Sequence, residues 1–365
     1  MTNRDRILSE FQKLVSFDAE SGCEEEIAKY LQSRLQALGL SVKKDKAGNL
    51  YGFLPGTRSG EALLFSAHMD TVSPGKGKKA IVQENGHITS DGTTVLGADD
   101  VSGLTAILEA LSVIQEKKLP HPDLEILFST GEELFGQGIA SFDFGCLRSK
   151  KAYVLDLTGP VGNASIQAPS ILSIDVSVTG RAAHAGFAPE EGINALTISA
   201  RALSKLKTGH IDSETTVNFG VISGGERRNI VPAAIHIQGE VRSLDHQKAL
   251  KQAELIRAAF CSEAEVLQGQ AEVTVTEKLH AYCVPKDAPV VKRFQRALAA
   301  LDYGEGALTV TFGGSDNNNF AQHGLSGIVL ACAMENVHTT AEYTDLAELQ
   351  KASELTLQLM TEEDE

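Results

Sequence analysis

Residues 63–71 place the strongest constraint on what this chain can fold into. A run of apolar and small residues leads into His68, Met69 and Asp70, which predicts a buried strand with two polar side chains at its C-terminal end. Residues i and i+2 of an extended chain point to the same side, so His68 and Asp70 are expected to be neighbours. Such a pair suits a metal-binding imidazole whose tautomer is fixed by a carboxylate. The alternative for this pair taken alone is a strand that ends in a solvated loop.

Composition narrows the class of protein. The chain has 365 residues, more than a usual single domain, so two domains are expected. Its formal net charge of -15 argues against nucleic acid or an anionic membrane as the main partner, because phosphate binding requires concentrated Lys and Arg. The excess of acidic residues also leaves carboxylates available to bind cations.

The cysteines and the N-terminal residues indicate a cytoplasmic protein. The first residues show an amphipathic helix pattern and not the apolar core of a signal peptide, and no run is long enough for a membrane span. The cysteines are scattered, odd in number and lack Cys-x-x-Cys spacing, which favours reduced thiols. They are Cys23, Cys146, Cys261, Cys283 and Cys332.

The beginning of the chain alternates between helix and strand patterns. Helices are predicted at 4–16, 24–38 and 102–116, and strands at 40–43, 50–54, 62–67, 124–129 and 152–156. This alternation predicts an α/β fold with a mixed, mostly parallel sheet and helices on both faces. Residues 75–96 are rich in Gly and polar residues and are expected to form a long loop or hairpin.

The pattern changes near residue 170. The predicted elements are strands at 171–178, 214–222, 233–241 and 271–277 and helices at 192–207 and 246–262. Their β-α-β-β-α-β order predicts a ferredoxin-like α+β domain at 171–283, inserted into a larger domain made of 1–170 and 284–365.

Acidic residues stand where several predicted strands end. Besides His68 and Asp70 they are Asp99, Asp100, Glu132, Glu133 and Asp156. Ligands of open α/β sheets bind outside the carboxyl ends of the strands, so these side chains are expected to converge on a shared metal site. Each acid taken alone is more simply a helix cap or a solvated residue.

Several motifs in the same order resemble one known family, the co-catalytic dinuclear zinc exopeptidases. This family includes peptidase T, the glutamate carboxypeptidases and the succinyl-diaminopimelate desuccinylases. The motifs are His68-Met69-Asp70-Thr71-Val72, Gly97-Ala98-Asp99-Asp100, Gly131-Glu132-Glu133, Asn229-Ile230-Val231-Pro232, Gly313-Gly314-Ser315-Asp316 and Asn336-Val337-His338-Thr339. Peptidase T is the most similar, because its inserted domain resembles residues 183–186 and 189–195.

The resemblance implies a metal site with a bridging carboxylate. Asp99 would bridge two ions, the first also held by His68 and Asp156 and the second by Glu133 and His338. Imidazole and carboxylate ligands suit zinc, although manganese or cobalt can occupy such a site. The resemblance also implies a cis peptide bond after Asp99.

The resemblance assigns roles to three further residues. Glu132 would be the general base that takes a proton from a metal-activated water, and Asp70 would orient His68. His184 would stabilise the oxyanion, from a partner subunit or after domain closure, which implies a homodimer and a lid or dimerisation role for 171–283.

Substrate-binding residues are also implied. They are Asn229, Arg242, Gly313 and Asp316. Arg242 could bind a peptide carboxylate bidentately, and the alternative is a surface salt bridge. Relatives often carry Lys after the Asp99-Asp100 pair and Gly after Asp156, whereas Val101 and Leu157 stand here. The remaining histidines, His87, His121, His210, His236, His246, His280 and His323, have no spacing that suggests a metal ligand.

Together these features predict a dizinc aminopeptidase that releases the N-terminal residue of short peptides. The alternatives are a deacylase or carboxypeptidase that acts on N-acyl amino acids, and a non-catalytic binding protein with the same fold. A serine hydrolase is disfavoured because the sequence lacks a Gly-x-Ser-x-Gly elbow, and a nucleotide-binding enzyme because it lacks a phosphate-binding loop.

Overall fold

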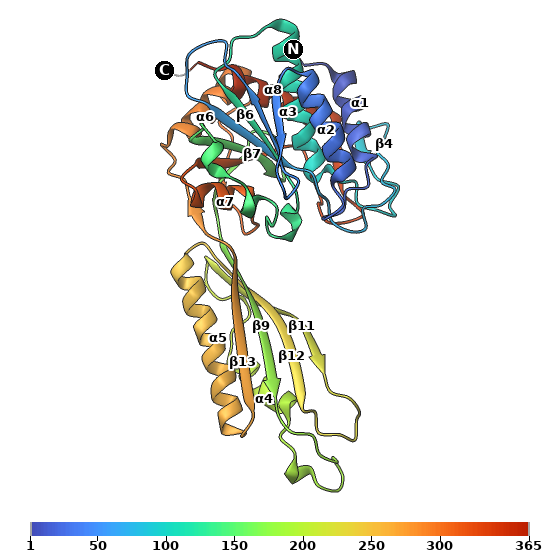
Figure 1. Ribbon diagram of the computed structural model, residues 1–365, viewed down its shortest axis with the longest axis vertical. Helices are drawn as coiled ribbons and strands as arrows, with labels where there is room; N and C mark the ends of the chain where they lie inside the picture. The colour runs from blue at the N-terminus through green and yellow to red at the C-terminus, as the bar shows by residue number, and fades with distance from the viewer. Residues whose placement is uncertain (1, 364–365) are drawn as a thin grey trace. The chain divides into compact units, whose positions relative to one another are not determined.

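The computed structural model describes residues 2–363, and the chain divides into two compact units. The first contains residues 1–167, 283–311 and 315–365, and the second contains 168–282 with 312–314. In Figure 1 the blue start and the red end of the chain belong to the first unit, and the green to orange middle forms the second. The second unit is therefore an insertion, and its assignment to a lid and dimerisation role remains a prediction.

The first unit contains a nine-stranded sheet. Its strands are β1 (Ser41–Lys44), β2 (Leu50–Leu54), β3 (Leu63–His68), β6 (Leu124–Ser129), β7 (Lys151–Leu157), β8 (Ala164–Ala168), β14 (Tyr282–Cys283), β15 (Leu308–Val310) and β16 (Ser326–Ala331). They lie in the order β1-β2-β6-β3-β7-β16-β8-β14, with β15 paired to β8. The central neighbours β6, β3, β7 and β16 run parallel, and β1, β2 and β8 add antiparallel pairs. The predicted mixed, mostly parallel sheet is confirmed.

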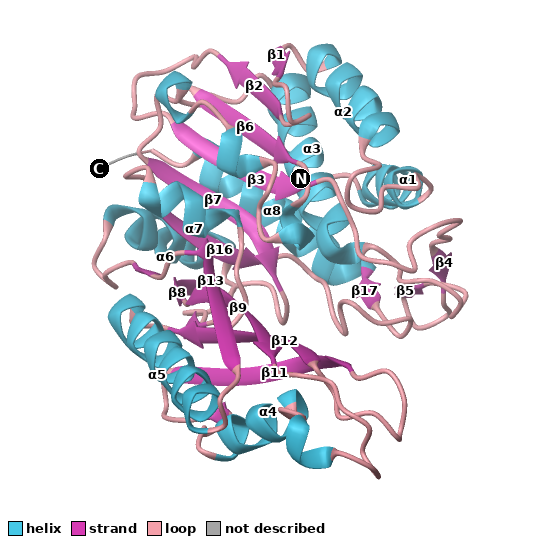
Figure 2. Ribbon diagram, turned by 60° about the horizontal axis from the view of Figure 1, so that its bottom comes forward, coloured by secondary structure: helices cyan, strands magenta, loops and turns pink. Residues whose placement is uncertain are grey.

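Helices cover both faces of this sheet (Figure 2). They are α1 (Arg4–Val15), α2 (Glu25–Ala37), α3 (Ala98–Lys117), α6 (Pro289–Leu301), α7 (Asp316–Gln322) and α8 (Leu346–Thr361), with short 3-10 helices η1 (Glu132–Leu134), η2 (Ile139–Ser141) and η3 (Phe144–Cys146). A small sheet of β4 (Ile81–Val82), β5 (His87–Thr89) and β17 (Tyr343–Asp345) lies in the loop region predicted at 75–96 and near the C-terminus. No helix within residues 2–363 is long and apolar enough to cross a membrane.

Alternation along the strands builds the two hydrophobic layers. Leu64 and Leu127 face one side, where they pack in a cluster with Phe320 of α7. Phe65 faces the other side and stacks on Tyr153, whose hydroxyl donates to the carbonyl of Val290 in α6. Because successive residues of a strand point to opposite faces, both layers come from the same fully buried strands.

The parallel strands end side by side, and this positions the site. In the β3–β6 pair His68 lies opposite Ser129, the last residue of β6. β7 pairs with the other edge of β3 and continues to Leu157. Helix α3 starts close by, after Gly97 in the left-handed region (φ 75°), a conformation that glycine adopts without steric cost. The carboxyl ends of β3, β6 and β7 therefore meet the start of α3.

The second unit is a ferredoxin-like α+β domain. Its elements are β9 (Ser170–Thr179), η4 (Pro189–Glu191), α4 (Ala195–Ser204), β10 (Gly209–His210), β11 (Thr215–Gly224), β12 (Ala234–Ser243), α5 (His246–Val266) and β13 (Gln270–Leu279). The antiparallel sheet has the order β10-β11-β12-β9-β13, and α4 and α5 pack on it around a core that includes Ile198, Ile256 and Phe260. Helix α4 is shorter than the predicted 192–207 because Asn194 caps it by accepting the amide of Thr197.

Candidate metal centre

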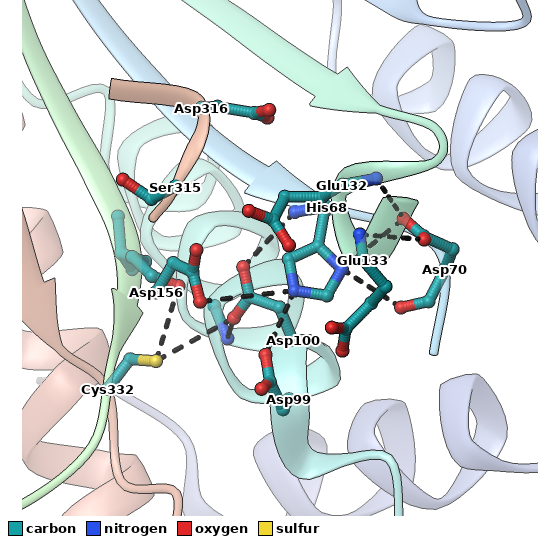
Figure 3. Close-up of polar contacts among 12 residues, drawn as sticks. His68, Asp70, Asp99, Asp100, Glu132, Glu133, Asp156, Ser315, Asp316 and Cys332 are labelled. Carbon is teal, nitrogen blue, oxygen red and sulfur yellow. Dashed lines mark hydrogen bonds and ion pairs between the residues drawn. The ribbon is translucent and has the colours of Figure 1, made fainter. Parts of the chain in front are cut away.

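His68, at the end of β3, is the buried centre of the site (Figure 3). Its Nδ1 lies 2.9 Å from the backbone carbonyl oxygen of Asp70, and its Nε2 lies 2.9 Å from Asp99 Oδ1. The Asp70 carboxylate is farther from Nδ1, at 3.5 Å. A proton on Nδ1 is therefore held mainly by the Asp70 carbonyl, which leaves the Nε2 lone pair for a cation. The predicted orienting role of Asp70 acts through its backbone as well as its side chain.

Asp99 lies between two histidines. Its Oδ1 faces His68 Nε2 at 2.9 Å, and its Oδ2 faces His338 Nε2 at 3.2 Å. The peptide bond from Asp99 to Asp100 is cis, as the resemblance implies. Each oxygen of one carboxylate is thus directed at a different imidazole, which is the arrangement required of a bridging ligand.

Two groups of potential metal ligands share Asp99. One is His68, Asp99 and Asp156, and the other is Asp99, Glu133 and His338. In the first, His68 Nε2 lies 3.9 Å from Asp156 Oδ1, and in the second His338 Nε2 lies 3.0 Å from Glu133 Oε1. Ligand atoms at zinc distances in a tetrahedron are roughly 3.4 Å apart. Both groups have the donor atoms and the spacing to hold a cation.

The electrostatics of the site also favour cations. Burial raises the pKa values of Glu132 and Asp156 well above their ordinary range, and neighbouring carboxylates raise them further. Hydrogen bonds to Asp99 and Glu133 raise the pKa of His338 to about 10. Burial raises the pKa of Asp99, but hydrogen bonds from His338 and His68 outweigh it, so that this pKa is lowered. Carboxylates are crowded here around two imidazoles, and divalent cations would relieve their mutual repulsion.

The Asp70 carboxylate fixes the segment that carries Glu132 and Glu133. Its Oδ1 accepts the backbone amide of Glu132 at 2.9 Å, and its Oδ2 accepts the amide of Glu133 at 3.2 Å. Ser21 Oγ donates to Oδ2 at 2.7 Å. Gly131, just before, adopts a left-handed conformation (φ 61°) that turns the chain out of β6. One buried carboxylate therefore sets the position of both acids relative to His68.

His338 is contributed to the site by a loop. Its backbone is left-handed (φ 62°), an uncommon conformation for a residue with a side chain. Its side chain is 51% exposed, whereas that of Asp99 is 9% exposed. The metal site is therefore open on the His338 side.

Glu342 is a buried residue that the sequence patterns did not indicate. Its Oε2 accepts the amide of Gly97 at 2.7 Å, and its Oε1 accepts the amide of Asp99 at 2.9 Å. Burial raises its pKa to about 7. Glu342 thus fixes the backbone of Asp99 from a segment 243 residues away in the sequence, a relation that no local spacing could reveal.

Replacing Glu342 by Gln is expected to weaken metal binding about 10- to 100-fold, the usual effect of removing a hydrogen-bond partner behind a ligand. Gln offers one acceptor oxygen for two amides, and its NH₂ group would face one of the donors. Competition with a chelator would measure the change. Glu348→Gln is the matched control, because Glu348 accepts the amide of Val161 outside the ligand segments. Equal metal affinities of the two variants would contradict this role for Glu342.

Asp100 and Cys332 make hydrogen bonds to the backbone of the elements that carry the site. Asp100 Oδ2 accepts the backbone amide of His68 at 3.1 Å, and its Oδ1 accepts the amide of Gly103 at 3.0 Å. The buried Cys332 thiol donates to the carbonyl of Leu155 at 3.3 Å. Asp100 therefore connects the end of β3 to α3.

Asp316, a predicted substrate-binding residue, makes its hydrogen bond to a neighbouring strand. It is buried at the start of α7, where Ser129 donates a short hydrogen bond to its Oδ2. Burial raises its pKa to about 6, although the Ser129 hydrogen bond opposes this. In Figure 3 its carboxylate lies apart from the group formed by His68, Asp99 and Glu133. These contacts link α7 to the end of β6, and the substrate contact of Asp316 stays a prediction.

The other predicted residues lie in the second unit, whereas the five predicted metal ligands lie in the first. Arg242 makes a bidentate ion pair with Glu240, at 2.7 and 3.1 Å, and donates to the carbonyl of Phe312 at 3.0 Å. This is the salt-bridge alternative, and the guanidinium holds the chain next to Gly313. Asn229 accepts the amide of Ala185 through its backbone carbonyl at 3.0 Å.

His184 has a defined tautomer. Its Nδ1 accepts the amides of Gly186 and Phe187, both at 3.2 Å, so the ring proton is on Nε2. The ring stacks on that of Phe187 with centroids 4.3 Å apart, and both residues are exposed. His184 therefore presents an N–H donor at the surface of the second unit.

Comparison with known proteins agrees with this arrangement. Family models described as "Peptidase family M28" and "Peptidase dimerisation domain" match residues 49–160 and 166–266. The chain is 38% identical to the uncharacterized protein YqjE of Bacillus subtilis, with 99% of each chain covered.

Two solved structures are also similar over nearly the whole chain. Aminopeptidase PepT from Bacillus cereus is 37% identical with a TM-score of 0.91, and a tripeptidase from Staphylococcus aureus is 34% identical with a TM-score of 0.96. Both alignments cover 99% of this chain and 98% of the other. Identity at this level over full length is shared by members of one family, and this chain therefore belongs to the peptidase T-like family of M20 exopeptidases.

Proposed function

We propose that this chain is a metal-dependent aminopeptidase that releases the N-terminal residue of short peptides. The observation that carries the proposal is the pair of ligand groups that share Asp99, with Glu132 next to the ligand Glu133. The similar structures named as an aminopeptidase and a tripeptidase support the same substrate class.

In this proposal, different residues of the chain have different chemical roles. Two divalent cations bound between His68, Asp99 and His338 would lower the pKa of a water molecule and polarise the scissile carbonyl. Glu132 takes the proton of the attacking water and delivers it to the leaving amine. The Asp70 carboxylate, which binds the Glu132 amide, keeps this base in position.

Zinc is the proposed metal, because two imidazoles and three carboxylates match its usual ligands. Manganese and cobalt are compatible with the same donor set. A cytoplasmic location is proposed as well, and it is supported by the absence of disulfides among the five cysteines, all of which are free thiols.

A homodimer is the proposed assembly, and residues 166–266 match a peptidase dimerisation domain. In this proposal the Nε2–H of His184 donates to the carbonyl oxygen of the substrate in the partner subunit, where negative charge develops in the transition state. The tautomer fixed by the Gly186 and Phe187 amides supports this donor role.

Mixing His184→Ala protein with Glu132→Ala protein tests this arrangement. If His184 acts across the dimer, random exchange of subunits should restore about a quarter of wild-type turnover, because half of the dimers are mixed and each contains one intact site. The controls are each variant alone and a mixture assayed before the subunits have had time to exchange. Action across the dimer would be contradicted if the turnover of the exchanged mixture is no higher than the summed turnover of the two separate variants.

The substrate class is tested with a panel of compounds and metal-reconstituted protein. Di- and tripeptides with a free N-terminus should be cleaved at the first peptide bond, whereas N-terminally blocked peptides should resist cleavage. Turnover confined to N-acyl amino acids would overturn the aminopeptidase proposal in favour of a deacylase or carboxypeptidase. No turnover of any compound by protein with both metals bound would favour a non-catalytic binding protein.

A further inference from the structure

A second group of metal-binding side chains lies in the inserted domain. His246, Glu277 and His280 each offer a ligand atom, and these atoms lie within 4.8 Å of one another. His246 is the first residue of α5, Glu277 belongs to β13, and His280 follows the end of that strand. The 33 residues between the two histidines explain why no local spacing indicated them.

The distances within this group resemble those of the catalytic groups. His280 Nδ1 lies 2.7 Å from Glu277 Oε1, and His246 Nε2 lies 3.9 Å from Glu277 Oε2. These values bracket the roughly 3.4 Å expected between ligands of a tetrahedral zinc ion. The two imidazole rings are tilted against each other, with centroids 4.0 Å apart and an interplanar angle of 32°. The ligand atoms are close enough for one ion to bind all three once the side chains rotate so that their lone pairs converge.

Ser170 orients His246 for this purpose. Its Oγ, which is fully buried, lies 2.9 Å from His246 Nδ1 and accepts the backbone amide of Ala281 at 2.8 Å. When Nδ1–H donates to this oxygen, the Nε2 lone pair is the one that faces Glu277. A hydrogen bond on the far nitrogen is the usual support of a metal-binding histidine.

The surrounding charges tolerate a cation. Glu277 supplies one negative charge, and the Asp245 carboxylate adjoins His246 while it caps α5 by accepting the amides of Gln247 and Lys248. The Lys248 ammonium is itself directed to Glu214. These carboxylates offset the positive end of the helix dipole, which would otherwise disfavour an ion at this place.

The three side chains are also accessible. The exposed fractions are 19% for His246, 42% for Glu277 and 38% for His280, so an ion can enter from solvent and a water molecule can complete its coordination. We propose that His246, Glu277 and His280 form a separate site for a divalent transition metal, with zinc as the first choice, in the inserted domain. Two imidazoles and a carboxylate suit Zn²⁺ and Cu²⁺ better than Mg²⁺ or Ca²⁺.

An ion in this site would connect the start of α5 to the end of β13. These two elements pack along each other (Figure 1), and Ser170 and His280 lie within two residues of the points where the chain enters and leaves the second unit. Because the ion binds the folded arrangement, its binding would stabilise the inserted domain in proportion to the logarithm of the zinc concentration. This proposal does not depend on the proposed function.

Equilibrium dialysis of the full-length protein against Zn²⁺ tests the site. Wild-type protein should bind about three zinc ions per chain, and the His246→Ala/His280→Ala variant about two, with unchanged aminopeptidase turnover. His236→Ala is the matched control, because His236 lies on β12 of the same domain, contacts Ser177 in the way that His246 contacts Ser170, and belongs to no ligand group. It should still bind three ions.

A second variant distinguishes the loss of the site from a folding defect. Glu277→Gln keeps the size of the side chain but removes its charge, and it should weaken the third ion at least tenfold while the first two stay bound. Nitrogen NMR of the wild-type protein should show zinc on His246 Nε2 and a proton on Nδ1. The proposal is overturned if, at saturating zinc, the double histidine variant binds as many ions per chain as the wild-type protein, whatever that number is.

Discussion

Replacing Glu132 by Gln is expected to lower kcat about 10²- to 10⁴-fold, the usual contribution of a general base. Gln preserves the shape of the side chain, and the Glu132 backbone amide can still donate to Asp70. Only the ability to accept and return a proton is lost. Both metal ions should stay bound, because Glu132 belongs to neither ligand group.

The adjacent Glu133 provides a matched comparison. Glu133→Gln alters a side chain of the same type whose amide is held by the same Asp70 carboxylate, but it weakens a ligand of the second group. It should lose one ion per chain, and added metal should restore part of its activity. The Glu132 variant should not respond to added metal. Ordinary turnover of Glu132→Gln protein with both ions bound would remove Glu132 from the role of base.

Replacing Asp99 by Ala is expected to abolish the binding of both ions and with it essentially all turnover. Asp99 is the only residue common to the two ligand groups, and each of its oxygens faces a different histidine. Asp156→Ala, by contrast, should weaken only the ion held with His68. Metal analysis after dialysis at a fixed free zinc concentration distinguishes the two results. Retention of one tightly bound ion by Asp99→Ala protein would show that the groups are independent and that no bridge exists.

Local patterns were sufficient to predict most of the fold. The apolar run before His68 and the alternation at 171–178 correspond to β3 and β9 within one or two residues. Strand periodicity and burial follow from the same apolar residues, so the mostly parallel sheet and the ferredoxin-like insertion could both be predicted. The predicted start of this helix at residue 102 differs from the observed start of α3 at Ala98, and the two residues Asp99 and Asp100 at its beginning have non-helical backbone angles.

The site was predictable where its residues follow strands. His68, Glu133 and Asp156 meet because parallel strands end at one edge of the sheet, and Asp99 joins them from the start of α3. His338 is different: a loop supplies it, and only the resemblance indicated its role. Contacts that join distant segments were not predictable, because a buried carboxylate such as Glu342 has the same local surroundings in sequence as a solvated one.

The contacts of the predicted substrate-binding residues could not be predicted from the sequence. Arg242 was assigned from its place at the end of a strand and Asp316 from a motif; in the structure the Arg242 guanidinium pairs with Glu240, and Ser129 donates to the Asp316 carboxylate. A motif preserves the position of a residue but does not determine which neighbour satisfies its charge. That neighbour depends on packing, which sequence spacing does not describe.

The central claim is that this chain holds two metal ions bridged by Asp99. Anomalous X-ray diffraction from crystals of zinc-loaded protein, recorded on both sides of the zinc absorption edge, tests it most directly. Around Asp99 the account predicts two zinc peaks roughly 3.5–4 Å apart, one next to His68 and Asp156 and the other next to Glu133 and His338, with Asp99 between them. A single peak at this place, or two peaks there that do not share Asp99, would contradict it.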